Sequence, residues 1–110
     1  MSDWVDVAPL AELMPGSPRL VDLDDVLVAV FNVNGEIHAI QNVCTHDGFP
    51  LVGDGHADIV NGEEIRCPRH GARFCLRTGA ATAPPAYEPV AVFPTRVVDG
   101  LIQVRDARFD

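Results

Sequence analysis

The chain has 110 residues, 47% of them hydrophobic, so a single domain over residues 1–110 is expected and intrinsic disorder is disfavoured. Sixteen acidic residues stand against eight arginines and no lysine, and the net charge of −8 disfavours nucleic acid and anionic membranes as partners. No stretch approaches the roughly 20 apolar residues of a membrane span, and no leader sequence is expected. Three cysteines do not suggest a disulfide framework, so a reducing, cytoplasmic setting is predicted.

The first half of the chain predicts short strands. Residues 4–13 begin as a strand and end in a loose turn, and residues 19–23 alternate polar and apolar side chains as a half-buried strand does. Residues 26–33 are apolar on both alternating faces and rich in β-branched side chains, which favours a strand covered on both sides. Asn34-Gly35 then predicts a tight hairpin turn, because both central residues of such a turn need positive φ, with a return strand over 36–41.

Two more hairpins are predicted in the second half. Asn61-Gly62 predicts a turn within residues 59–66, and Asp99-Gly100 predicts a turn between strands over 90–98 and 101–105. No segment shows a 3.6-residue period. The predicted fold class is therefore all-β, an antiparallel sandwich or small barrel.

A short strand is also predicted around residues 73–77. Phe74 and Leu76 alternate onto one face and are expected to pack in the core, whereas Cys75 lies on the other face and is predicted to be a partly exposed free thiol. The Pro84-Pro85 pair predicts a rigid loop.

The Cys and His residues gather in two motifs, Cys44-Thr45-His46 and Cys67-Pro68-Arg69-His70. Two thiolates and two imidazoles are enough to hold a metal centre. Zinc accepts such a set, but its arms usually pair like with like, whereas each arm here mixes the two donor types. A binuclear centre, with both cysteines on one iron and both histidines on the other, explains the mixing better.

These motifs, Cys-x-His and Cys-x₂-His, resemble the Rieske signature, and with the residues around them they resemble the soluble bacterial Rieske-type ferredoxins. The likeness extends to Ala72-Arg73-Phe74 and the Pro84-Pro85 loop, which would shield the cluster. It implies a Rieske-type [2Fe-2S] cluster in a cluster-binding subdomain over about 42–86, formed by two loops at one end of the fold. The implied metal and cofactor ligands are Cys44, His46, Cys67 and His70.

The sequence departs from the respiratory and photosynthetic Rieske proteins in two respects. Those proteins carry a further cysteine in each arm, which together form a disulfide, and the matching positions here are Phe49 and Arg69. They also carry a serine and a tyrosine that donate hydrogen bonds to cluster and ligand sulfurs, where this chain has Ala72 and Phe74. Such donors stabilise the reduced cluster, so their absence predicts a potential near the low end of the Rieske range, roughly −150 mV.

No catalytic constellation can be assembled, so the chain is not expected to be an enzyme. The resemblance implies a one-electron carrier, the ferredoxin component of a multicomponent aromatic-ring dioxygenase, between a flavin-containing reductase and a terminal oxygenase. Both histidine ligands would lie at an exposed tip, and the contacts there would be transient, which suits a monomer. The predicted apolar contact patch consists of Phe49, Pro50, Pro68 and Pro84.

Several alternatives stay open at this point. The protein could be an accessory of iron–sulfur cluster assembly, or a partner similar to the small subunit of nitrite reductase. His38 and His56 are more readily structural or solvated than functional. The arginines between residues 66 and 77 could form a solvated strand face, or Arg69 and Arg73 could orient the cluster end toward carboxylates of a partner.

Overall fold

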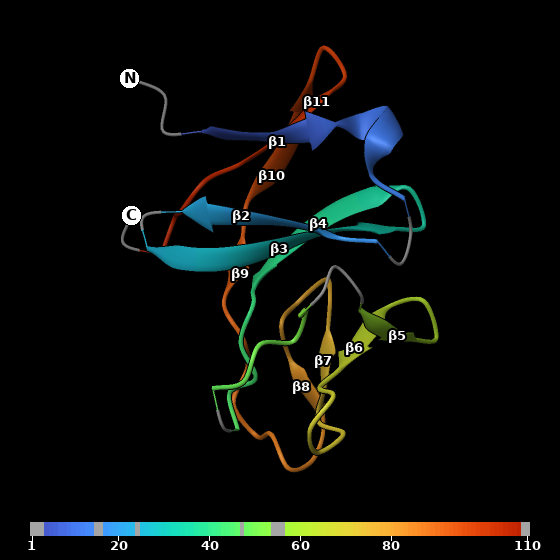
Figure 1. The fold of residues 1–110 in the computed structure, drawn as a ribbon, viewed down its shortest axis with the longest axis vertical. Helices are drawn as coiled ribbons and strands as arrows, with labels where there is room; N and C mark the ends of the chain where they lie inside the picture. The colour runs from blue at the N-terminus through green and yellow to red at the C-terminus, as the bar shows by residue number, and fades with distance from the viewer. Residues whose placement is uncertain (1–3, 15–16, 24, 47, 54–56, 109–110) are drawn as a thin grey trace.

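The computed structural model describes residues 4–14, 17–23, 25–46, 48–53 and 57–108, and it confirms the all-β class. Three antiparallel sheets make up this part of the chain (Figure 1). Their strand orders are β1-β11-β10, β2-β3-β4-β9 and β5-β6-β7-β8. Among the described residues, no helix is long and apolar enough to cross a membrane.

The strands are short. Their bounds are β1 Val5–Pro9, β2 Arg19–Leu23, β3 Val26–Val33, β4 Glu36–Gln41, β5 Asp58–Val60, β6 Glu64–Arg66, β7 Arg73–Cys75, β8 Ala81–Ala83, β9 Val92–Phe93, β10 Thr95–Val98 and β11 Leu101–Val104, with one 3₁₀ turn, η1, over Leu10–Glu12. In Figure 1 the first two sheets lie together as a base, and the β5–β8 sheet lies at the opposite end with the long loops.

The three predicted hairpin turns are confirmed. Asn34, Asn61 and Asp99 have φ values of 52°, 55° and 51°, and the glycine after each also has positive φ. Asparagine and aspartate tolerate this conformation better than other side chains do, which explains why these dipeptides occur at the turns.

The strand predicted over residues 90–98 is in fact two strands in two sheets. Pro94 separates them: β9 pairs with β4, whereas β10 pairs with β11. Proline has no backbone N–H to donate to a ladder, so one continuous strand is disfavoured there. Strand β8 was not predicted, because its three small residues, Ala81–Ala83, show no apolar alternation.

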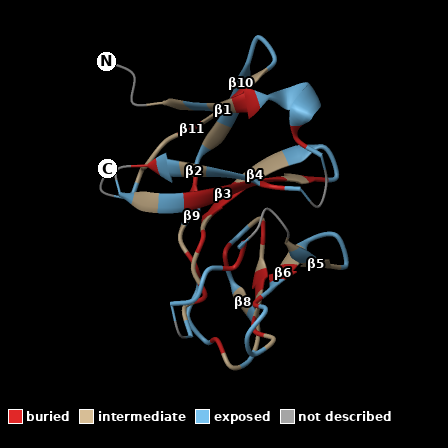
Figure 2. Cartoon of the chain, viewed as in Figure 1, coloured by how far each residue is buried: buried red, intermediate tan, exposed pale blue. Residues whose placement is uncertain are grey.

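Strand β3 is covered on both faces, as its sequence predicts. Val28 and Val30 belong to a core within the base, whereas Ala29, Phe31 and Val33 belong to a second core that extends into the β5–β8 end. Figure 2 shows the buried residues following β3 and continuing into the loops. The second core contains both Cys44 and Cys67, and also Ile40, Leu51, Val52, Ile65, Ala72, Phe74, Leu76, Ala86 and Val90.

The chain at Gly79 leaves no room for a side chain. Its φ is +78°, and a Cβ there would overlap the carbonyl oxygen of Val90. The same backbone is fixed on both sides, because the Gly79 N–H donates to the Cys75 carbonyl and the Val90 N–H donates to the Gly79 carbonyl, each at 2.8 Å.

We therefore expect Gly79→Ala to reduce the free energy of unfolding by about 2–5 kcal/mol, from about 1–2 for the left-handed backbone and about 1–3 for overpacking. Gly100→Ala is the matched control, since Gly100 has φ +79° and nothing near its missing Cβ. Gly100→Ala should lose only the about 1–2 kcal/mol that the left-handed backbone costs. Thermal unfolding of both variants measures the difference, and equal losses would contradict the overlap at Val90.

Candidate metal centre

The first motif forms a turn that closes on itself directly after β4. The Cys44 N–H donates to the Phe49 carbonyl at 2.8 Å, and the Gly48 N–H donates back to the Cys44 carbonyl at 2.7 Å. Gly48 has φ +77°, a conformation that favours glycine. The turn therefore folds from local sequence and points the Cys44 side chain into the core.

The second motif repeats this turn between β6 and β7. The Cys67 N–H donates to the Ala72 carbonyl at 2.7 Å, and the Gly71 N–H donates to the Cys67 carbonyl at 3.1 Å, with φ +79° at Gly71. The two motifs thus share one backbone design, although His46 stands two residues after its cysteine and His70 stands three after its own.

The structure brings the four predicted ligands together as two pairs. Cys44 and Cys67 are both 1% exposed and lie in the same core. His46 and His70 are exposed, and their ring centroids are 5.4 Å apart at an interplanar angle of 89°. Since a metal–imidazole bond is about 2 Å long, two rings at this spacing can share one ion.

This pairing fits a binuclear centre better than a single zinc ion. In the described part of the chain, no three His, Cys, Asp or Glu side chains gather closely enough to hold one ion. A tetrahedral zinc site needs all four donors around one point, whereas a Rieske [2Fe-2S] cluster takes two thiolates on one iron and two imidazoles on the other. Two buried thiols and two exposed imidazoles match the second requirement.

Apolar side chains surround the cysteines. Ala72 and Phe74, at the positions where a hydroxyl was predicted to be lacking, are completely buried. From the other side, Ala86 and Val90 of the proline-containing loop join the same core. The Thr45 hydroxyl donates to the Glu88 carbonyl at 2.7 Å and so ties that loop to the first turn.

The two turns also touch through side chains beside the ligands. The guanidinium carbon of Arg69 lies 5.1 Å from the centre of the Phe49 ring. None of the three cysteines forms a disulfide. The positions that match the disulfide cysteines of the respiratory Rieske proteins are therefore in non-covalent contact here.

Three arginines near the second motif, in β6, in β7 and just after β7, have carboxylate partners. Arg66 pairs with Asp58 at 2.7 Å, and Arg73 lies 3.9 Å from Glu64. Arg77 pairs with Glu63 at 3.1 Å and also with Glu36 of β4. Arg66, Arg73 and Arg77 therefore fit the prediction of a solvated strand face, because acidic residues on neighbouring segments balance their charge.

Cys75 is a half-buried free thiol, as predicted. Burial raises the pKa of Cys75, but hydrogen bonds from the Thr78 side chain and from the backbone of Thr78 and Arg77 outweigh it, so the net pKa is lowered. His56 lies outside the described residues.

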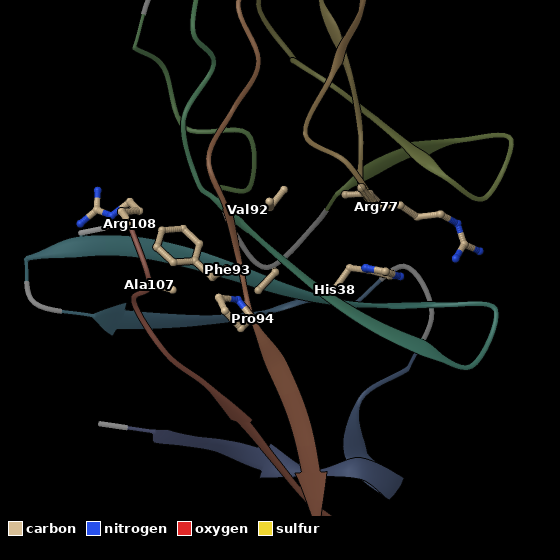
Figure 3. Close-up of a pocket in the computed structure, with 9 residues that line it drawn as sticks. His38, Arg77, Val92, Phe93, Pro94, Ala107 and Arg108 are labelled. Atoms are coloured by element: carbon tan, nitrogen blue, oxygen red, sulfur yellow. The ribbon is translucent and has the colours of Figure 1, made fainter. Parts of the chain in front are cut away.

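The other described histidine outside the motifs, His38, is half-buried with its Nε2 3.2 Å from Glu36. It borders a hollow of about 380 Å³ between the base and the cluster-binding end, together with Arg77, Phe93, Pro94 and Arg108 (Figure 3). None of the four predicted ligands lines this hollow.

Comparison with known proteins identifies the family of the chain. Residues 3–94 match the family described as Rieske [2Fe-2S] domain. The biphenyl dioxygenase ferredoxin subunit of Pseudomonas sp. (strain KKS102) is 41% identical over 86 residues, 78% of this chain and 76% of that protein. The 3-phenylpropionate/cinnamic acid dioxygenase ferredoxin subunit of Escherichia coli (strain K12) is 36% identical over 92 residues, 84% and 83% of the two chains.

Solved structures agree as well. The ferredoxin of carbazole 1,9a-dioxygenase from Nocardioides aromaticivorans IC177 is 36% identical, with a TM-score of 0.80 over 94% of this chain and 98% of that one. A chain from a complex of reduced oxygenase and oxidized ferredoxin in carbazole 1,9a-dioxygenase is 29% identical, with a TM-score of 0.83 over 96% and 94%. With buried thiols and exposed imidazoles on the same two turns, the chain belongs to the Rieske [2Fe-2S] family and is a ferredoxin, an electron carrier that holds a Rieske-type cluster.

Proposed function

We propose that this ferredoxin carries single electrons from a flavin-containing reductase to a terminal ring-hydroxylating oxygenase. The observation that carries the proposal is that each of the two turns pairs a buried thiol with an exposed imidazole, which offers a short path from a protected cluster to a docked protein. The relatives support it, since they are ferredoxin subunits of aromatic dioxygenases and one neighbour was solved in a complex of oxygenase and ferredoxin. Turnover reconstituted from all three components separates this carrier from an accessory of cluster assembly.

Three further features belong to the proposal. The chain acts as a monomer that releases each partner after one transfer. It works in the cytoplasm, where reducing conditions disfavour disulfides between its three cysteines. Residues 1–110 form one domain, because β3 contributes side chains to both cores.

We also propose the assignment of the ligands. Cys44 and Cys67, whose thiols are buried, would hold one iron, and His46 and His70, which are exposed, would hold the other. The cluster supplies one reversible electron. The protein excludes water from the sulfur side through buried apolar residues such as Phe74 and leaves the ring edges accessible.

Cys67→Ser and His46→Ala test this assignment. Each should abolish the Rieske-type EPR signal of the reduced protein and its full iron and sulfide content, because each removes one of the four donors. Cys75→Ser is the matched control, since Cys75 is a free thiol outside both turns and should keep the signal. A colourless wild-type protein that contains zinc, or loss of the cluster in Cys75→Ser alone, would contradict the assignment.

The apolar surroundings of the cysteines support the predicted low potential. Ala72 and Phe74 offer no hydroxyl to the sulfurs, so their side chains do not stabilise the more negative reduced cluster through a hydrogen bond.

Ala72→Ser should therefore raise the midpoint potential. A bond that favours the reduced state by about 1 kcal/mol corresponds to roughly 40 mV, since 59 mV is a tenfold change for one electron. Protein-film voltammetry measures this shift, with Ala39→Ser, in the other core, as the control that should leave the potential unchanged. A wild-type midpoint above zero, or no shift in Ala72→Ser, would count against the explanation.

The residues of the predicted contact patch are exposed, and we add one more residue to the proposed patch. Phe49 is 38% exposed, and Pro50, Pro68 and Pro84 are exposed as well. Tyr87, which sequence reasoning missed, is 84% exposed on the loop that Thr45 ties to the first turn. An exposed tyrosine on a fixed loop beside the electron-transfer tip is a typical anchor for a protein partner.

Tyr87→Ala should weaken docking to the oxygenase, with the half-saturating ferredoxin concentration rising roughly tenfold, as for an interface residue worth about 1.4 kcal/mol. Tyr87→Phe keeps the apolar ring and should stay within about twofold of the wild type. Because the contact is apolar, the ratio between variants should hold at low and high salt. Equal docking of the alanine variant and the wild type would remove Tyr87 from the interface.

A further inference from the structure

The two cluster-binding turns belong to different sheets. The turn with Cys44 follows β4 of the β2-β3-β4-β9 sheet, whereas the turn with Cys67 joins β6 and β7 of the β5-β6-β7-β8 sheet. Each turn closes through its own backbone hydrogen bonds. Those bonds shape each turn but do not hold one turn against the other.

A direct contact between the turns comes from Arg69 and Phe49. The guanidinium lies over the ring, 5.1 Å from its centre. Both residues are close to ligands in the chain: Arg69 directly precedes His70, and the Phe49 carbonyl accepts the Cys44 N–H at 2.8 Å. A displacement of either side chain is therefore transmitted to a ligand over very few bonds.

We propose that Arg69 and Phe49 form a latch that holds the two turns together and slows the loss of iron from the cluster. The inference rests on the proposed ligand assignment, because the latch matters only if each turn supplies ligands to one shared cluster. Iron leaves when the turns separate far enough for solvent to reach the inner thiolates. The latch reduces the population of that opened state.

The size of the effect follows from the exposure of the pair. A cation–π contact at an exposed site changes an equilibrium by about two- to fivefold, and Phe49 is 38% exposed. When opening is fast compared with iron loss, the rate of loss follows the opened population. Removing either partner should therefore speed iron release by about two- to fivefold.

The test uses the oxidised ferredoxin with its cluster bound, mixed with an iron chelator, and follows the decay of the visible circular dichroism of the cluster. Phe49→Leu removes the ring face without a change of charge, and Arg69→Gln removes the cation. Both should release iron about two- to fivefold faster than the wild type. Arg69→Lys, which keeps a cation, should lie between Arg69→Gln and the wild type.

The double variant Phe49→Leu/Arg69→Gln separates a latch from two unrelated effects. If the residues act through one contact, the double variant releases iron no faster than the faster single variant. If the two increases multiply, the latch is refuted. The midpoint potential adds an independent readout: Phe49→Leu should leave it unchanged, whereas Arg69→Gln should lower it, because a positive charge near the cluster favours the reduced state.

A second arginine–aromatic contact provides the control. Arg96 lies over Trp4 at 4.2 Å, on the β1-β11-β10 sheet at the other end of the molecule. Arg96→Gln should leave the rate of iron release unchanged, even if it lowers the melting temperature. Equal acceleration in Arg96→Gln and Arg69→Gln would indicate general destabilisation and overturn the latch. A failure of the ligand assignment is seen separately, because the wild type would then lack the cluster.

Discussion

The burial of two thiols in one core is the constraint on which the site depends. Cys44 and Cys67 come from turns of different sheets, yet both belong to the same buried core as Phe74 and are almost completely shielded from solvent. A thiolate in such a place is costly unless a metal takes its charge. The fold thus provides a position that a cationic centre would stabilise, and in the proposed assignment the exposed imidazoles supply the remaining ligands.

This arrangement divides the molecule into parts with different tasks. The base sheets hold β4, and with it the first turn, through their own core, while β5–β8 carry the second turn. Strand β3 and the ion pair of Arg77 with Glu36 of β4 connect the two ends. Electron transfer needs little motion within the carrier, so a rigid connection between base and tip suits the function.

Much of the fold was predictable, for a local reason. Dipeptides such as Asn34-Gly35 adopt positive φ in isolation, and the alternation within β3 places its side chains on two faces whatever surrounds them. The predicted strand over residues 90–98 was wrong because the chain changes from one sheet to another at Pro94. The strand propensities of the flanking residues do not reveal which sheet each segment joins. Tyr87 was missed because nothing in its sequence neighbourhood distinguishes an exposed tyrosine from a buried one.

The sequence by itself determined the chemistry of the centre: the residue types and spacings of the two motifs select donors and turn shape, and both are local properties. Only the tertiary structure decided how those motifs meet. The carboxylates that neutralise Arg66 and Arg77, the ring beneath Arg69 and the carbonyl that holds Thr45 all come from other segments of the chain. Such contacts depend on which strands pair and at what register, and that is settled by the packing of the whole chain around its buried core.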